Sequence, residues 1–380
     1  MSSKAARYYR PELDALRFFA FLGVFCFHRM DYVDVNPRRQ PWLYNISTAG
    51  AFGVCLFFLL SSFLIVELLL REREQTGTVH VKAFYLRRIL RIWPLYFAAF
   101  FGLALLAHFL PEVGPTSRAS WLAFSLFAGN WYILKHGWIA GPVDPLWSIS
   151  IEEQFYIFVP MLVRFGGKKA LKLVSVLLIA IAYFTIFRYA RVHTVGDNGE
   201  WTDSWVQFQF FAAGALLAIA LRGRLPQWPW VARVAVFVLA AACWVAAVVG
   251  PRVKSWDAHP SVGGAFAGWG LIVVGCALFL LAVLGAPGKY VPRWLAYLGR
   301  ISYGLYIFHS LILYLVFKQA ARWLSEGTAV MHLPGTVTPA FGTAVVLILT
   351  FVIAHLSYRF FERPFLRLKQ RFAFVRSRPE

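Results

Sequence analysis

The chain has 380 residues, of which 59% are hydrophobic and 15% are charged, so it has too little charge to cover a soluble domain of this length. Lysine and arginine total 38 against 18 aspartate and glutamate residues, a formal charge of +20. These cations lie between apolar runs, as in cytoplasmic loops that face anionic headgroups, and no polar stretch interleaves basic and aromatic residues. Composition therefore predicts a protein of the lipid bilayer and argues against nucleic acid as a partner.

Apolar segments of about the length that spans a bilayer as a helix recur along almost the whole chain. They lie near 13–33, 49–70, 89–110, 119–135, 146–165, 170–190, 205–221, 229–250, 262–285, 296–318 and 339–361. The segment at 119–135 is the weakest of them. It is short, contains Asn130 and runs directly into Lys135, His136 and a loop with glycine and proline.

The distribution of charge indicates whether this weak segment crosses the membrane. If every segment crosses, the basic loop with Arg164, Lys168 and Lys169 falls outside, against the positive-inside rule. If 119–135 is re-entrant or lies along the outer surface, that loop returns to the cytoplasm. We therefore predict an all-α polytopic membrane bundle of about ten transmembrane helices, plus a re-entrant segment near 119–135. The expected location is the cell inner membrane with both termini cytoplasmic. A single membrane domain over 13–365 is expected between solvated tails at 1–12 and 366–380.

The first span, ELDALRFFAFLGVFCFHRM, contains ionisable side chains that are costly in a bilayer and are therefore candidates for function. Arg17 and His28 are eleven residues apart, which is three helical turns plus about 20°, so they share a face with Asp14. At a rise of 1.5 Å per residue they stand roughly 16 Å apart along the axis. A neutral imidazole at this depth suits a general base. The alternative is structural: Asp14 pairs with Arg17, and His28 bonds to a backbone carbonyl.

Three arginines open the third span in YLRRILRIWPLY. Arg88 and Arg91 are neighbours on one helix face, and Arg87 lies beside Arg91. Positive-inside anchoring explains one or two such residues, whereas three within five residues also suit a phosphate clamp. Both interpretations stay open from the sequence.

Adjacent carboxylates enter an apolar helix in PLWSISIEEQFYIFVP. Ser148 and Glu152 lie on one face, and the predicted topology puts Glu152 at a depth similar to that of His28. Glu152 would then orient the imidazole of a catalytic base. The alternative is a hydrogen bond between helices.

A further polar stripe occurs in LGRISYGLYIFHS, where Ser302, Tyr306 and His309 recur at helical spacing. The simpler interpretation of His309 is a packed histidine that is bonded to a neighbour. The nine histidines have no partners at metal-ligand spacing, and the four cysteines are isolated within apolar runs, so we predict neither a metal site nor a disulfide framework.

Together these motifs resemble the acyltransferase-3 family of integral membrane acyltransferases, over about residues 10 to 366. RPELDALRFFAFLGVFCFH is similar to the first span of that family, with Arg17 and His28 on its pattern of a basic residue, ten spacers and a histidine. FFLLSSFLI resembles its second span, although Ser61-Ser62 stands where Ser-Gly is usual. The remaining matches are Arg88 and Arg91 on an Arg-x-x-Arg motif, Trp147, Ser148, Ser150 and Glu152 on Trp-Ser-x-Ser-x-Glu, and the closing segments ISYGLYIFH and YRFFERPF.

The resemblance implies ten spans, an acyl-CoA donor, acetyl-CoA being the expected one, and carbohydrate acceptors of the cell surface. Some members have an additional extracytoplasmic esterase-like domain. We expect this chain to be a stand-alone member, which completes the transfer alone or uses a separate extracytoplasmic partner protein.

The residues and the resemblance together give a mechanistic hypothesis. Arg88 and Arg91 hold the phosphates of acyl-CoA, the pantetheine arm passes Arg17, and the thioester lies near His28, which Glu152 orients. Direct transfer and a covalent acyl relay on His28 both stay open. Other candidate functions are a transporter or flippase for an anionic lipid-linked substrate and an acyltransferase that acts on a lipid or small molecule.

Overall fold

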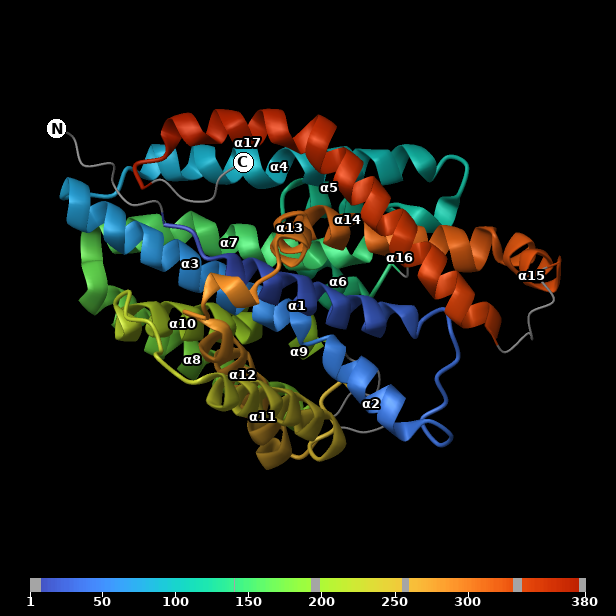
Figure 1. Ribbon diagram of the computed structural model, residues 1–380, viewed down its shortest axis with the longest axis horizontal. Coiled ribbons are helices and arrows are strands. Elements are labelled where there is room, and N and C mark those ends of the chain that lie inside the picture. Colours follow the sequence, from blue (N-terminus) through green and yellow to red (C-terminus); the bar gives the residue numbers. More distant parts are fainter. Residues whose placement is uncertain (1–7, 140, 193–198, 255–259, 331–336, 376–380) are drawn as a thin grey trace.

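The structure is a computed structural model that describes residues 8–139, 141–192, 199–254, 260–330 and 337–375 (Figure 1). Within these ranges the chain forms helices joined by loops and contains no strand. This confirms the predicted all-α helical bundle.

The elements are numbered along the chain, with short 3-10 and π segments labelled η. The first half contains α1 (Pro11–Arg29), α2 (Pro41–Gly50), α3 (Gly53–Thr76), α4 (Val81–Leu106), η1 (Pro111–Val113), α5 (Arg118–Ser125), α6 (Gly129–His136), η2 (Asp144–Leu146), α7 (Trp147–Met161), η3 (Leu162–Gly166) and α8 (Gly167–Arg191). The second half contains α9 (Gly199–Thr202), α10 (Ser204–Leu221), α11 (Trp230–Val249), α12 (Val262–Val283), η4 (Gly288–Tyr290), α13 (Arg293–Arg300), α14 (Ser302–Tyr314), η5 (Leu315–Gln319), α15 (Ala321–Val330), α16 (Thr338–Leu356), η7 (Ser357–Glu362), α17 (Arg363–Lys369) and η8 (Gln370–Phe372).

The described residues include seven helical segments that are long and apolar enough to cross a membrane, or eight if a bent pair is one span. α1 is not among them, because it carries Glu12, Asp14 and Arg17 within its 19 residues. The stretch Asp144–Arg191 is a single segment in this set, although Figure 1 shows the chain turning between α7 and α8. Gly167, the first residue of α8, has φ +61°. The multi-pass membrane bundle is confirmed, and the figure of ten crossings stays a prediction.

The outer faces of the long helices carry large apolar side chains. Phe158, Phe184, Val238 and Ile348 are all exposed. Contiguous apolar surface of this kind is uncommon on soluble monomers and is what lipid tails contact in a bilayer.

The weak segment at 119–135 forms two short helices, α5 and α6, of eight residues each. At 1.5 Å per residue each is about 12 Å long, far less than the roughly 30 Å of a bilayer core. Between them Phe127 has φ +54°, in the left-handed region that interrupts a helix. This geometry agrees with a segment that does not cross. α6 packs against α7 and α9.

α1 is the central helix of the bundle and packs against α2, α3, α12, α13 and α14 (Figure 1). Two glycine contacts fix its position. A Cβ on Gly50 of α2 would stand 2.2 Å from the carbonyl oxygen of Gly23, and one on Gly299 of α13 would stand 1.7 Å from that of Asp14. Small residues that let backbones approach this closely are typical of membrane helix contacts. They set the rotation of the helix that carries Arg17 and His28.

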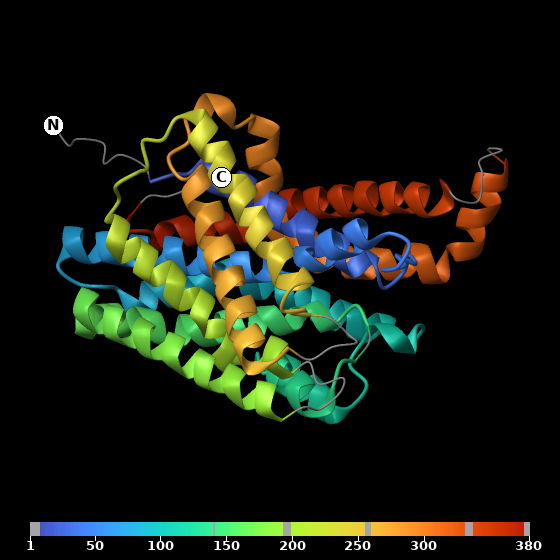
Figure 2. The ribbon, with the colours of Figure 1, turned by 90° about the horizontal axis from the view of Figure 1, so that it is seen from below.

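α3 packs against α10, and α11 and α12 form a pair that crosses obliquely over α8 and α10 (Figure 2). Ser62 Oγ of α3 donates to the carbonyl oxygen of Phe211 of α10 at 2.6 Å. The backbones of α3 and α10 approach closely at Gly214 of α10, where a Cβ would lie 2.4 Å from the carbonyl oxygen of Leu59. Both contacts join α3 to α10.

The C-terminal segment packs on the bundle as far as the structure describes it. α17 extends to Lys369 and lies along α4, as does η8. Arg87 Nη1 donates to the carbonyl oxygen of Phe372 at 2.6 Å, and the ring of Phe374 stacks on His80 with centroids 3.8 Å apart. Residues 370–375 are therefore held against α4, whereas a solvated tail was expected.

Candidate active site

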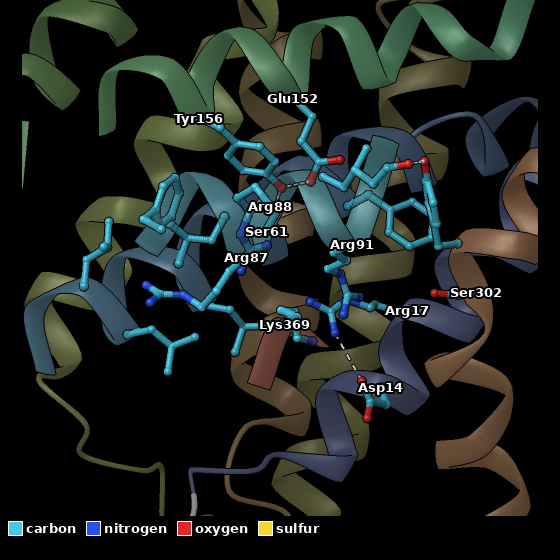
Figure 3. Close-up of a pocket in the computed structure, with 18 of the residues that line it drawn as sticks. Asp14, Arg17, Ser61, Arg87, Arg88, Arg91, Glu152, Tyr156, Ser302 and Lys369 are labelled. Atoms are coloured by element: carbon cyan, nitrogen blue, oxygen red, sulfur yellow. Dashed lines mark hydrogen bonds and ion pairs between the residues drawn. The ribbon is translucent and has the colours of Figure 1, made fainter. Parts of the chain in front are cut away.

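A cavity of about 540 Å³ lies between α1, α3, α4, α7, α14 and the C-terminal segment (Figure 3). Its lining brings together four of the sequence motifs, which are represented by Asp14 and Arg17, Arg87, Arg88 and Arg91, Ser148 and Glu152, and Ser302 and Tyr306. The lining contains six cations, Arg10, Arg17, Arg87, Arg88, Arg91 and Lys369, and three carboxylates, Asp14, Glu72 and Glu152. This excess of positive charge favours an anionic ligand. We call this space the arginine cavity.

Arg88 lies at the centre of one wall, over two aromatic rings. Its guanidinium carbon is 5.6 Å from the ring centroid of Phe84 and 5.5 Å from that of Tyr156, close enough for cation–π attraction. Its buried Nε has no hydrogen-bond partner among the described residues. A buried charged donor without an acceptor is costly, and a phosphate oxygen in the cavity would satisfy it.

Arg17 and Arg91 come from α1 and α4 and lie close together in Figure 3, where their charges act on one another. Arg17 Nη1 forms an ion pair with Asp14 Oδ1 at 3.1 Å, as the sequence predicted for its structural alternative. The charge of Glu152 also acts on Arg17, but the lining still holds six cations against three carboxylates. An anion bound between Arg17 and Arg91 would relieve their repulsion.

Arg87 lines the cavity next to the C-terminal segment. Its Nη2 lies 3.0 Å from Glu72 Oε2, and Glu72 also accepts a hydrogen bond from the backbone N–H of His80. Because Arg87 already has a carboxylate and the carbonyl of Phe372 as partners, it joins the C-terminal segment to α3.

Glu152 points into the arginine cavity and does not bond to His28 among the described residues. Its carboxylate accepts a hydrogen bond from Tyr156 OH, and Tyr156 OH in turn lies 2.6 Å from Ser61 Oγ. The charge of Glu152 acts on both Arg17 and Arg88. The structure therefore places this carboxylate with the arginines, because equal depth in the membrane does not fix the direction in which a side chain points.

His28 instead contacts His309 of α14. His28 Nδ1 and His309 Nε2 are 2.8 Å apart, and His309 Nδ1 lies 2.6 Å from the carbonyl oxygen of Tyr306. A carbonyl only accepts, so His309 Nδ1 must carry the proton and Nε2 of the neutral ring must accept from His28 Nδ1–H. His28 Nε2 is then left with a free lone pair. His309 is fully buried and is held by an edge contact with Phe21, with ring centroids 5.8 Å apart.

Tyr306 connects the arginine cavity with the two histidines. Its side chain lines the cavity and its backbone carbonyl holds His309. Its hydroxyl lies 2.7 Å from Ser148 Oγ and donates to the carbonyl oxygen of Pro145 at 3.0 Å. Ser148 is thereby a partner of Tyr306.

The other predicted candidates have separate places. Ser302 lines the cavity at the start of α14. Ser150 accepts from the backbone N–H of Gly129 at 3.3 Å and so connects α7 to α6. Trp147 is buried, and its ring centroid lies 6.3 Å from that of Trp138 and 6.2 Å from that of Trp201.

Sequence reasoning missed Tyr156, Ser61 and Lys369 as cavity residues. Tyr156 follows Glu152 by four positions, so helical spacing could have paired them. Ser61 belongs to the second-span motif, and nothing local indicates that its hydroxyl reaches α7. Lys369 lies in the segment that was expected to be a solvated tail.

Within the described ranges no group of three or more His, Cys, Asp or Glu side chains has the geometry of a metal site. The four cysteines are free, and Cys55 and Cys276 are buried. What the residues offer for chemistry is therefore the arginine cavity and the histidine pair.

The chain is similar in sequence to known acyltransferases. A family model described as an acyltransferase domain matches residues 10–359. The chain is 25% identical over 389 residues to the peptidoglycan O-acetyltransferase OatA of Listeria monocytogenes, which covers 96% of this chain and 57% of that protein. It is also 25% identical over 382 residues to the O-acetyltransferase OatA of Staphylococcus aureus, which covers 94% of this chain and 57% of that protein. The chain thus spans a little over half the length of the curated relatives it matches.

No solved structure matches the chain significantly. The family match extends over all the helices that line the arginine cavity except the C-terminal segment, and over both histidines of the pair. This chain therefore belongs to the acyltransferase-3 family of polytopic membrane proteins.

Proposed function

We propose that this protein is a membrane O-acetyltransferase that moves an acetyl group from acetyl-CoA to a hydroxyl of an extracytoplasmic glycan. The observation that carries the proposal is the His28–His309 pair, which leaves a base with a free lone pair and is joined by Tyr306 to a cavity rich in arginine. The names of the relatives supply the chemical class, O-acetyl transfer, and in one case peptidoglycan as the acceptor.

The arginine cavity is the proposed donor site. Acetyl-CoA brings several phosphate charges, and Arg88 and Arg91 present guanidinium groups that bind phosphate with good geometry. Arg17 lies deeper along α1, beside the proposed course of the pantetheine arm. Eleven residues at 1.5 Å each separate it from His28 by about 16 Å, a distance comparable with the reach of that arm.

His28 is the proposed general base. Its Nε2 takes the proton of the acceptor hydroxyl while the hydroxyl oxygen attacks the thioester carbonyl carbon. The carbon–sulfur bond then breaks, and the coenzyme A sulfur leaves with the proton that His28 returns. His309 is a positioning residue, because it fixes the tautomer and orientation of His28 through one hydrogen bond. Acid-quench trapping of labelled protein would separate this direct transfer from a relay in which Nε2 first accepts the acetyl group.

The arrangement in the membrane is also part of the proposal. The basic loops and the cations of the arginine cavity favour the cytoplasmic side for the donor, in the cell inner membrane with both termini cytoplasmic. His28, at the other end of α1, then faces the acceptor. A separate extracytoplasmic partner protein that passes the acetyl group to its final acceptor fits this arrangement.

The test is turnover of acetyl-CoA by purified protein in nanodiscs, followed as release of free thiol in the presence of peptidoglycan fragments. His28→Ala is expected to lower the rate about 10²- to 10⁴-fold, the usual contribution of a general base. His108→Ala is the matched control, because His108 does not line the cavity and its Nδ1 lies 3.3 Å from the carbonyl oxygen of Ala104 in its own helix turn. A folded His28→Ala protein with the turnover of the wild type would refute the proposal.

A further inference from the structure

A half-buried lysine lies near the end of α1 that carries His28, away from the arginine cavity. Lys254 belongs to the loop between α11 and α12, and its Nζ is 4.5 Å from the ring centroid of Trp201, 5.6 Å from that of Trp138 and 5.7 Å from that of Phe27. The rings come from α9, from the loop after α6 and from α1. Four segments that are distant in sequence thus meet around one ammonium group.

The loop backbone is held in an unfavourable conformation to put the lysine there. Arg252 has φ +59° and Lys254 has φ +69°, in the left-handed region that residues other than glycine rarely adopt. Val253 between them anchors the loop, since it is 1% exposed and its N–H donates to the carbonyl oxygen of Ala247 at 3.1 Å. Strain of this kind persists where the surroundings enforce it and is concentrated at functional sites.

The aromatic groups around Lys254 are held firmly but are not all covered. Trp201 is 5% exposed, and its backbone carbonyl accepts a hydrogen bond from Gln207 at 2.7 Å. The residue after Trp138, Ile139, donates its backbone N–H to Asp144 Oδ1 at 3.1 Å. Trp138, Phe27 and Lys254 are half-buried, so each keeps part of its surface open to a ligand.

The cluster is adjacent to the proposed base. Phe27 precedes His28, their ring centroids are 5.4 Å apart, and the charge of Lys254 acts on the His28 ring. On the other side, Trp147 of α7 packs against both Trp138 and Trp201. A ligand on this cluster would therefore reach His28 from the side opposite to a donor in the arginine cavity.

Resting on the proposed function, we propose that Lys254, Trp138, Trp201 and Phe27 form the acceptor subsite and that it binds the sugar ring that carries the reactive hydroxyl. Flat aromatic faces pack against the C–H faces of a pyranose, and binding sites combine such apolar walls with a few polar groups that fix orientation. The ammonium supplies three donors for the hydroxyl and carbonyl oxygens of the sugar. The subsite thereby selects carbohydrate over an acyl-lipid acceptor.

The experiment compares Lys254→Met with wild type in nanodiscs, with water-soluble peptidoglycan fragments as the acceptor. We expect the KM for the fragments to rise at least about tenfold, while the KM for acetyl-CoA stays unchanged. Lys289→Met is the matched control, because Lys289 follows the C-terminal end of α12 and makes a similar contact, with Nζ 5.0 Å from the ring centroid of Tyr290. It is expected to behave as wild type.

A second variant covers the case in which Lys254→Met does not fold. Burial lowers the pKa of Lys254 to about 8. Its ammonium form is therefore lost above about pH 8, and the acceptor KM of the wild type should rise there. Lys254→Arg stays charged throughout, so its KM should stay flat. The other charged or titratable groups that act on this lysine are His28, Asp31, Glu200 and Cys55, and they are the same in both proteins.

The outcomes separate this inference from the proposed function. Failure of the wild type to release thiol or to acetylate the fragments would overturn the proposed function and the subsite with it. The subsite alone would be overturned if turnover depends on His28 but the acceptor KM of Lys254→Met equals that of the wild type. It would also be overturned if the acceptor KM of Lys254→Arg rises with pH as that of the wild type does. A rise in KM for both substrates would show Lys254 to be structural.

Discussion

Replacement of His309 by leucine tests the arrangement of the proposed base directly. In the wild type His309 Nε2 accepts from His28 Nδ1, and His309 Nδ1 donates to the carbonyl of Tyr306. Leucine has similar bulk and removes both interactions. His28 would then carry its proton on either nitrogen, and the form with the proton on Nε2 has no lone pair at the reactive position.

The expected loss follows from the hydrogen bond that is removed. A buried donor left without a partner costs about 1–3 kcal/mol, and each 1.4 kcal/mol corresponds to about a tenfold change in rate. We therefore expect kcat to fall about 10- to 100-fold, less than for His28→Ala, because the base itself remains. The KM for acetyl-CoA should not change, since His309 does not line the arginine cavity.

The assay is thiol release from acetyl-CoA in nanodiscs, with thermal unfolding measured in parallel. His355→Leu is the control, because His355 Nδ1 also makes one side-chain hydrogen bond, at 2.7 Å to Tyr297 OH. His309→Gln should recover part of the activity, since its amide oxygen can accept from His28. A His309→Leu protein that keeps the kcat of the wild type, or that loses only affinity for acetyl-CoA, would refute the reasoning.

Three further predictions concern the donor site and the packing of α1. Arg88→Met should raise the KM for acetyl-CoA about 10- to 100-fold, because it removes a charged hydrogen-bond donor. The control Arg164→Met removes an exposed arginine over Phe165 and should leave this KM unchanged. If Arg88→Met and the wild type have equal KM values for acetyl-CoA in steady-state assays, Arg88 has no role in donor binding. Glu152→Gln keeps an acceptor for Tyr156 and should lower kcat less than about tenfold. A loss of kcat as large as that of His28→Ala would show that Glu152 orients the imidazole of His28. Gly299→Ala should destabilise the protein by at least about 1–3 kcal/mol, because its Cβ would meet the carbonyl oxygen of Asp14. Gly102→Ala, with open space around it, serves as the control in thermal unfolding, and equal melting temperatures would show that the α1–α13 contact adapts.

Helical periodicity alone determined which residues share a face. The 100° step puts Asp14 beside Arg17, and the structure shows that ion pair at 3.1 Å. The same step grouped Arg88 with Arg91, and both line one cavity. The break at 119–135 was likewise visible in the sequence, because the segment is short and polar at its end. These features depend only on neighbouring residues along the chain.

Only the tertiary structure decided which faces meet. His28 and His309 are 281 positions apart, and their contact depends on how α1 and α14 are rotated against one another. Glu152 was expected at the depth of His28, but depth in the membrane does not determine in which direction around the helix axis a side chain points. Its carboxylate accepts a hydrogen bond from Tyr156 instead. Lys254 lies in a loop without a motif, so nothing local indicated that its ammonium reaches rings on three other segments. Helix rotation is set by close contacts such as that of Gly299 with Asp14, which join residues far apart in the chain and have no local signature.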